Sequence, residues 1–205
     1  MVWNREYGRC GTYWGRKTKC LPHVFGGKTV LEAGVGNGKT LLSILDQGPR
    51  YVAAIDFSHQ ALKLCEKTVG RKDNLAYTRA DLLNLPFAQE TFDVVVLYYV
   101  LDNMLQQERI EAVEEARRFL RDGGKAVFED FAVGDFREAT AKRVNVPEPH
   151  TLLKKKGLIC HYFTEEEVLG LFRDFRKKEA AIRESKPIKN KDHLVRRTIS
   201  GVMEK

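Results

Sequence analysis

The sequence predicts an α/β fold in which helices cover both faces of a doubly wound, mostly parallel sheet. Apolar runs alternate with amphipathic segments through the middle of the 205-residue chain, which is typical of βαβ units. The runs VAAI (52–55) and FDVVVL (92–97) are almost wholly apolar, as in parallel strands buried on both faces. The glycine-rich stretch VLEAGVGNGKT (30–40) begins in the first expected strand, and such sheets bind ligands at the carboxyl ends of their strands.

Each element has its own signal along the chain. The apolar runs predict strands at Thr29–Leu31, Tyr51–Ile55, Leu75–Thr78, Phe92–Leu97 and Gly124–Phe128. The segments between them predict helices at Lys39–Gln47, His59–Gly70 and Gln106–Leu120. Ser58 suits the N-cap of the second helix, and Thr164 with Glu167 forms a capping box before a later one. Two last strands, Lys178–Arg183 and Leu194–Glu204, are expected to form an antiparallel hairpin at one edge of the sheet.

Composition limits the class of protein. The chain is 43% apolar, but no apolar run is long enough to span a bilayer. The N-terminus lacks the apolar region of a secretory signal, so we expect a soluble cytoplasmic protein with no membrane partner. The four cysteines contain no CxxC pair, which predicts free thiols and no metal, although Cys20 and His23 would make half of a metal site.

Charge is distributed unevenly along the chain. Residues 1–29 carry six Lys/Arg and one acidic residue, residues 30–136 carry twelve and seventeen, and residues 137–205 carry seventeen and ten. The centre is therefore acidic and both flanks are basic. Basic flanks of this kind favour a polyanionic partner.

The glycine-rich loop is compatible with three kinds of nucleotide site. A P-loop requires glycine where the chain has Ala33, and a dinucleotide-binding turn requires glycine where it has Lys39. Glu32 ends the first strand, and a carboxylate there would repel a triphosphate or a pyrophosphate. It would favour a ligand that carries an ammonium and a sulfonium, as S-adenosylmethionine does.

The second strand supports a nucleoside ligand. Asp56 ends this strand and can accept hydrogen bonds from both ribose hydroxyls, and Phe57 can pack on an adenine. Asp56 has a second interpretation as an ordinary helix-capping residue next to Ser58. It does not separate the nucleotide classes by itself.

Five motifs in register resemble those of the Rossmann-like (class I) S-adenosylmethionine-dependent methyltransferases. They are EAGVGNG (32–38), IDFS (55–58), ADL (80–82), FDVVVL (92–97) and LRDGGKAVF (120–128). The resemblance implies a seven-stranded sheet and S-adenosyl-L-methionine as cofactor. It implies that Gly34, Gly36 and Gly38 lie along the methionine part and Glu32 near its amine. Asp56 would hold the ribose, Phe57, Asp81 and Leu82 the adenine, while Leu97 and Tyr98 would line the floor beneath the methyl group.

We expect this to be a single methyltransferase domain over residues 1–205, because the chain has no internal repeat and no low-complexity linker. Residues 1–27 would be an N-terminal cap segment, and 28–131 the cofactor-binding core. Residues 132–160 would be a substrate loop or lid, and 161–205 the closing helix and strands.

The C-terminal third resembles the tRNA 3-methylcytidine methyltransferase family. The matching stretches are FEDF (128–131), GDF (134–136), YFTEEE (162–167) and VRRTISGVMEK (195–205), whereas LDNML (101–105) departs from that family's pattern. The resemblance implies methylation of a base nitrogen in tRNA. Aromatic residues among basic ones would bind this substrate: Tyr13, Trp14, Arg16, Lys17 and Tyr162. The alternative is that the basic stretches are solvated surface and the aromatic residues are core.

Methyl transfer from a sulfonium depends chiefly on alignment, and a ring nitrogen needs no strong base. The candidates for orienting or deprotonating the acceptor follow the fourth and fifth strands: Tyr99, Asp102, Asn103 and Asp130. His161 is interpreted as structural. Three alternatives stay open at this point: a small-molecule methyltransferase with a lid, a non-catalytic cofactor-binding module, and an ATPase that depends on Lys39. The sequence does not indicate an oligomeric state.

Overall fold

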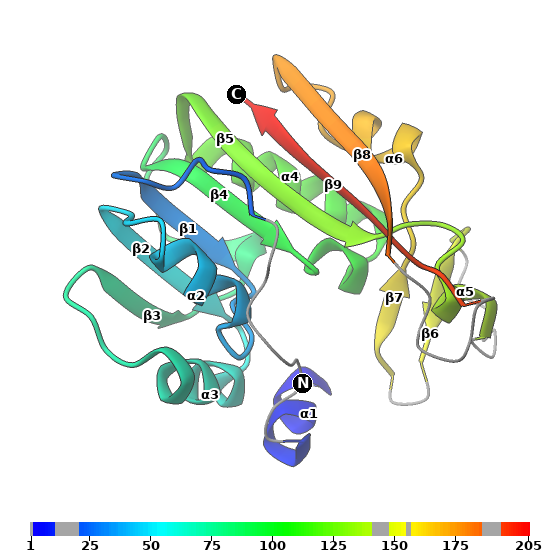
Figure 1. The fold of residues 1–205 in the computed structure, drawn as a ribbon, viewed down its shortest axis with the longest axis horizontal. Helices are drawn as coiled ribbons and strands as arrows, with labels where there is room; N and C mark the ends of the chain where they lie inside the picture. The colour runs from blue at the N-terminus through cyan, green and yellow to red at the C-terminus, as the bar shows by residue number, and fades with distance from the viewer. Residues whose placement is uncertain (1, 11–20, 141–147, 155–156, 186–193) are drawn as a thin grey trace.

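The computed structural model describes residues 2–10, 21–140, 148–154, 157–185 and 194–205. One sheet of seven strands has the order β3-β2-β1-β4-β5-β9-β8 (Figure 1). The strands are β1 (Thr29–Ala33), β2 (Tyr51–Asp56), β3 (Leu75–Arg79), β4 (Phe92–Tyr98), β5 (Leu120–Phe131), β8 (Lys177–Ser185) and β9 (Arg196–Glu204). The first five are parallel, and β9 is antiparallel to both β5 and β8. The predicted fold class is confirmed.

The helices cover both faces of the sheet, as predicted. On one face, α2 (Lys39–Leu45) and α3 (His59–Val69) pack on strand residues such as Val30. On the other face, α4 (Gln106–Phe119) and α6 (Glu165–Leu171) pack on the neighbouring Leu31 and its equivalents. Successive residues of a strand point to opposite faces, so a strand covered on both sides must be apolar throughout.

The predicted strand at 124–128 is longer in the structure. β5 extends to Phe131 because residues 125–131 pair in register with β9. This extension carries Glu129 and Asp130 beyond the apolar run and toward the end of the sheet where β4 stops.

Six elements were not predicted: α1 (Val2–Cys10), α5 (Phe136–Thr140), β6 (Thr151–Leu153), β7 (Ile159–His161) and the 3₁₀ helices η1 (Leu82–Asn84) and η2 (Leu101–Asn103). The short strands β6 and β7 form an antiparallel hairpin of their own. Both α1 and this hairpin lie at the carboxyl ends of the parallel strands (Figure 1). Every helix in the described ranges is too short or too polar to cross a bilayer.

Helix α1 rests on the start of α3. The Oδ1 atom of Asn4 accepts hydrogen bonds from the backbone N–H of Gln60 at 3.1 Å and from the hydroxyl of Ser58 at 3.3 Å. Ser58 caps α3 as predicted, since its Oγ accepts from the N–H of Ala61. The N-terminal helix is therefore fixed to the same turn that follows β2.

Candidate active site

A pocket of about 230 Å³ opens at the carboxyl ends of β1 to β4. Its lining includes most of the predicted cofactor and acceptor residues, namely Glu32, Gly34, Gly36, Asp56, Phe57, Asp81, Leu82, Tyr98, Tyr99, Asp102 and Asn103. The structure therefore brings together residues that lie up to 71 positions apart in the chain. This is the location where a doubly wound sheet binds its ligand.

Two glycines of the loop after β1 are needed for close approach. Gly34 has φ of 67° and Gly36 has φ of 56°, a region that side-chain-bearing residues rarely adopt. A Cβ atom on Gly34 would lie 2.7 Å from Val100, and one on Gly36 would lie 2.7 Å from the Tyr7 hydroxyl. The loop is therefore a smooth backbone cradle that any larger residue would fill.

Glu32 is buried at the end of β1, with 2% of its surface exposed. Its Oε2 atom has no hydrogen-bond partner among the residues that the structure describes. Burial raises the pKa of Glu32 well above its usual value, and the nearby Asp56 carboxylate raises it further. A buried, unsatisfied carboxyl beside the cradle fits an ammonium group and would oppose a phosphate. This observation favours a ligand with a free amino-acid group, such as S-adenosylmethionine, over the phosphorylated nucleotides of a P-loop or a dinucleotide-binding turn.

Asp56 connects the glycine loop to the end of β2. Its Oδ2 atom accepts from the N–H of Gly36 at 2.9 Å, and its Oδ1 atom accepts from the N–H of Ser58 at 2.8 Å. The helix cap itself is Ser58, so Asp56 is not an ordinary capping residue. Each carboxylate oxygen accepts more than one hydrogen bond, so both remain available to a ligand's hydroxyls.

The acceptor side of the pocket has an aromatic wall. The Tyr99 and Phe131 rings lie 5.1 Å apart. The Tyr99 hydroxyl donates to Oε1 of Glu129 at 2.5 Å, and the N–H of Tyr99 donates to the Glu129 carbonyl at 2.8 Å. Burial and Glu129 both raise the pKa of the Tyr99 hydroxyl. Tyr99 therefore acts here as a fixed wall, because its proton is already held by Glu129.

Asp102 and Asp130 form a buried carboxyl pair behind this wall. They are 3% and 0% exposed, and the N–H of Asp102 donates to Oδ2 of Asp130 at 3.1 Å. Burial raises the pKa of Asp102 to about 6 against the opposing effect of Lys154. Burial and the Asp102 charge raise the pKa of Asp130 well above its usual value. Burial thus favours the protonated form of Asp130, and the hydrogen bond with Asp130 favours the ionised form of Asp102. Asp102 lines the pocket while Asp130 does not.

The pair makes stability depend on pH with a defined sign. A carboxyl whose folded pKa is raised binds its proton more tightly in the folded state, so its contribution is present below about pH 4 and is lost as pH rises through about 6 and beyond. In Asp102→Asn the amide can accept from Asn103 and donate to Asp130. We expect the melting temperature of Asp102→Asn, measured relative to that of the wild type, to rise between pH 5 and pH 8. The exposed Asp174→Asn is the control, and a constant difference between Asp102→Asn and wild type would contradict the expectation.

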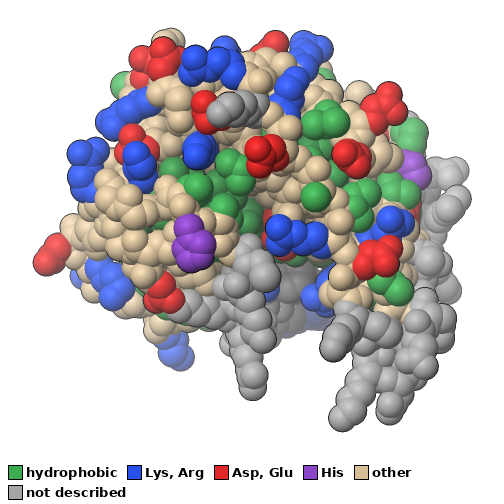
Figure 2. Space-filling view, turned by 45° about the horizontal axis from the view of Figure 1, so that its top comes forward, with side chains coloured by type: hydrophobic (Ala, Val, Ile, Leu, Met, Phe, Trp, Pro, Cys, Tyr) green, Lys and Arg blue, Asp and Glu red, His purple; other side chains and the backbone are tan. Residues whose placement is uncertain are grey.

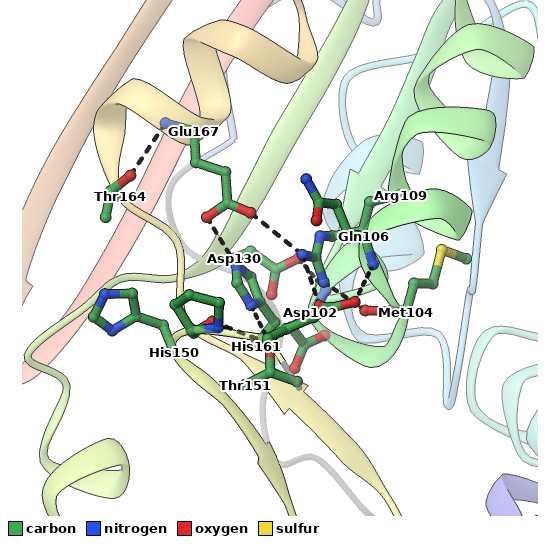
Figure 3. A network of polar contacts seen from close by, with 12 residues as sticks. Asp102, Met104, Gln106, Arg109, Asp130, His150, Thr151, His161, Thr164 and Glu167 are labelled. Carbon is green, nitrogen blue, oxygen red and sulfur yellow. Dashed lines mark hydrogen bonds and ion pairs between the residues drawn. The ribbon is translucent and has the colours of Figure 1, made fainter. Parts of the chain in front are cut away.

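A network around Arg109 connects the wall of the pocket to α4, α6 and the β6–β7 hairpin (Figure 3). The Arg109 guanidinium is buried and donates to the Met104 carbonyl at 2.7 Å, to Glu148 at 3.1 Å and to Glu167 at 3.4 Å. His161 lies between Glu167 at 2.8 Å and the Thr151 hydroxyl at 2.7 Å.

The same network decides two of the predictions. His161 is buried and held on both ring nitrogens, which agrees with a structural role. The predicted capping box at the start of α6 is formed only in half. The Thr164 hydroxyl accepts from the N–H of Glu167, but the Glu167 carboxylate binds Arg109 and His161.

Several predicted site residues lie elsewhere. Tyr162 is fully buried, with its ring centroid 6.0 Å from that of Phe131, so this placement does not fit its predicted contact with substrate. Leu97 is in the core below the pocket, and a Cβ on Gly38 would meet Val69 and Cys65 of α3. Tyr13, Trp14, Arg16 and Lys17 lie outside the described residues.

Sequence reasoning missed part of the lining: Trp3, Tyr7, Phe131, Arg137, Lys154 and Arg196. Trp3 and Tyr7 are one helical turn apart, with ring centroids separated by 5.8 Å, and this i, i+4 spacing was a usable signal for α1. The three basic residues gave no such signal, because they come from separate elements that only the fold brings together.

Basic side chains do not gather into one patch on the face shown in Figure 2. There the described Lys/Arg side chains are interspersed with Asp/Glu side chains. The basic side chains that line the pocket are therefore better evidence for an anionic ligand than the net charge of the flanks is.

Comparison with known proteins agrees with this geometry. Residues 31–128 match a family model described as "Methyltransferase domain". The chain is 24% identical over 152 residues to a Drosophila melanogaster tRNA N(3)-methylcytidine methyltransferase, covering 70% of this chain and 47% of the relative. It is 30% identical over 122 residues to a Thermobifida fusca demethylmenaquinone methyltransferase, covering 58% and 50%.

A solved Methanosarcina mazei protein described as a SAM-dependent methyltransferase has the same fold. Its TM-score is 0.73 at 20% identity, and the match covers 92% of this chain and 99% of that one. The chain spans about half or less of the length of the curated relatives it matches first. Residues 31–128 therefore form a methyltransferase domain, and the sheet around them has the class I fold of S-adenosylmethionine-dependent methyltransferases.

Proposed function

We propose that this protein transfers a methyl group from S-adenosylmethionine to a ring nitrogen of a base in RNA, with tRNA as the substrate. The observation that carries this proposal is a pocket with two chemically different sides. One side has the glycine cradle, Glu32 and Asp56. The other has the aromatic wall of Tyr99 and Phe131, whose rings are tilted by 49° to each other, and either ring face suits the stacking of an extruded base.

The cofactor side has a role for each residue in this proposal. The backbone of Gly34 and Gly36 lies along the methionine part, and Glu32 receives its ammonium. Asp56 accepts from the ribose hydroxyls, while Phe57, Asp81 and Leu82 surround the adenine at the pocket wall. When bound, the cofactor supplies an electrophilic methyl group.

The acceptor side contributes alignment. The lone pair of a ring nitrogen is already nucleophilic, so positioning is the main requirement. The Asn103 amide donates both to Asp102 and to the Tyr99 carbonyl, which fixes it at the pocket wall. Ionised Asp102, stabilised by the Asp130 proton, would accept from an exocyclic amino group of the base.

Two relatives support different methyl acceptors, RNA and a small molecule. The tRNA methyltransferase relative matches over 70% of this chain, whereas the demethylmenaquinone methyltransferase matches over 58% at higher identity. The longer match favours RNA. The higher identity keeps a small-molecule acceptor as the second candidate.

The direct test offers both acceptors to the protein. Labelled S-adenosylmethionine is incubated with unmodified tRNA transcripts and, separately, with a metabolite extract. We expect label in tRNA, with an apparent affinity that falls steeply as salt rises. Glu32→Gln, whose affinity for the cofactor should be lower, serves as the control and should incorporate less label at the same cofactor concentration. Label confined to the metabolite extract, with turnover that does not depend on salt, would establish the second candidate instead.

Glu32 also predicts that cofactor binding releases a proton. Burial and the Asp56 charge raise the pKa of Glu32, so both favour its protonated form in the free protein. An ammonium beside it favours the ionised form, so the pKa falls on binding and the proton leaves. Calorimetry with S-adenosylhomocysteine, in two buffers of different ionisation enthalpy, should show this release.

Glu32→Gln removes the ionisable group at nearly constant volume. We expect it to abolish the buffer dependence and to weaken binding about tenfold to a hundredfold, the range of a charge-assisted hydrogen bond. A variant that still released the proton would exclude Glu32 as its source.

A further inference from the structure

Most ionisable side chains of the pocket are separated by sign, and Lys39 and Asp102 are the two exceptions. The acidic residues Glu32, Asp56 and Asp81 stand at or just after the ends of β1, β2 and β3. The basic residues Arg137, Lys154 and Arg196 lie in α5, directly after β6 and at the start of β9. Arg196 is on β9, and Arg137 and Lys154 lie against Phe131 at the end of β5, so all three are on the opposite side of β4 from the acidic residues. Apart from these two residues, Lys39 and Asp102, the pocket is acidic where a cationic cofactor fits and basic on the acceptor side.

Arg137 is held by rings and keeps a free donor. Its guanidinium carbon lies 4.5 Å from the centroid of Phe131 and 5.1 Å from that of Phe136. Its Nη1 atom is buried and has no hydrogen-bond partner within the described part of the chain. The nearby Asp135 reaches only its Nε atom, at 3.9 Å.

Asp135 is already committed to the backbone, because its oxygens accept from the N–H of Arg137 at 3.0 Å and of Arg197 at 2.9 Å. The stacked guanidinium of Arg137 therefore keeps a buried N–H group that needs an acceptor. Because Arg137 lines the pocket, a ligand bound there would supply the hydrogen-bond acceptor for this N–H group.

Lys154 and Arg196 bring two more positive charges to the same wall. The Lys154 ammonium lies 5.9 Å from the Phe131 centroid, so it shares that ring with Arg137. Among the residues that the structure describes, no carboxylate lies within ion-pair distance of Lys154 or Arg196, although the Lys154 charge is near enough to lower the pKa of Asp102. A guanidinium fork with an ammonium beside it is a combination that proteins use for phosphate.

We infer that Arg137, Lys154 and Arg196 form a subsite for a phosphate group next to the base that is methylated. The inference rests on the proposed function, since it places that base against Tyr99 and Phe131. The wall and the three basic side chains together match a nucleotide: a planar ring and, beside it, an anion with several oxygens. The shared chemistry is the phosphate, whether it belongs to an RNA chain or to a free nucleotide.

The first experiment measures binding without turnover. In the presence of S-adenosylhomocysteine, calorimetry compares cytidine with cytidine 5′-monophosphate at low salt. We expect the phosphate to tighten binding about tenfold in the wild-type protein, and this gain to disappear in Arg137→Gln and Arg196→Gln. The affinity for S-adenosylhomocysteine should stay within twofold in every variant. Equal affinities for the nucleoside and the nucleotide, or a gain that persists in both variants, would overturn the subsite.

The second experiment separates an RNA phosphate from a free one. With tRNA as acceptor, each variant should raise KM about tenfold and lower the salt dependence by one phosphate contact. Arg173→Gln is the matched control, because the Arg173 side chain is 75% exposed, follows α6 and lies outside this pocket. Unchanged KM values with tRNA, together with a lost gain for the nucleotide, would assign the subsite to a free nucleotide. Absence of any label in tRNA would contradict the proposed function alone, and the binding experiment would still decide the subsite.

Discussion

Replacing Asp56 with alanine is expected to weaken the binding of S-adenosylhomocysteine by more than a hundredfold. The change leaves the N–H groups of Gly36 and Ser58 without their acceptors, at a cost of about 1–3 kcal/mol for each donor that stays buried. It also removes the acceptors proposed for the ribose hydroxyls. Because the glycine cradle is fixed through Asp56, both effects act on the same ligand. Calorimetry gives the affinity, and a thermal melt establishes that the variant is folded.

Lys39→Ala is the matched control for this experiment. Lys39 also lines the pocket, and a P-loop would require it for phosphate binding. The methyl donor carries no phosphate, so we expect Lys39→Ala to keep its affinity within about threefold, less than 1 kcal/mol. The opposite result, with a damaging Lys39→Ala and a neutral Asp56→Ala, would support an ATP site and refute the methyltransferase assignment of the pocket.

Replacing Arg109 with leucine should lower the free energy of unfolding by about 3 kcal/mol, the lower end of the range for breaking a buried ion pair. The side chain is 2% exposed and serves Met104, Glu148 and Glu167 together. Without it, the Met104 carbonyl and the carboxylates of Glu148 and Glu167 lose a charged donor in a partly dehydrated site, although Glu148 keeps the Gln106 N–H and Glu167 keeps His161. For a chain of this size we expect the melting temperature to fall by about 9 °C.

Arg117→Leu on the same helix is the control, since Arg117 is exposed and donates only to the Asp174 carbonyl among the described residues. It should change stability by less than about 0.5 kcal/mol. Burial acts to raise the pKa of Glu148, but the Gln106 N–H and Arg109 hold it below its usual value. This contribution is present above the unfolded pKa and is lost as pH falls through the folded one. Arg109→Leu should therefore lose less stability on acidification than the wild type, and equal losses would contradict the role of Arg109.

The central sheet could be predicted because its signal is local. A strand covered on both faces must be apolar at successive positions, and the runs at β2 and β4 meet this condition. The ends of β5 could not be read in this way. Its last residues, Glu129 and Asp130, are polar, and they belong to the strand because β9 pairs with them. β9 is distant in sequence, so the apolar pattern of residues 124–128 carried no information about it.

The cofactor-binding residues could likewise be predicted from the sequence, because they follow consecutive strands. The residues on the acceptor side could not. Arg137, Lys154 and Arg196 lie in three elements, and their convergence depends on the β6–β7 hairpin and on the reversal of β9. Tyr162 shows the converse error: an aromatic residue near basic ones suggested a surface, but its ring belongs to the cluster formed by Phe131, Leu152 and Cys160.

The first helix has a consequence for any shortened form of the protein. Asn4 accepts from Ser58, Ser58 donates its N–H to Asp56, and Asp56 in turn accepts from Gly36. A recombinant fragment that starts at β1 would therefore retain every strand and yet lack one end of this hydrogen-bonded relay. Such a fragment would keep the folded sheet but bind its methyl donor more weakly.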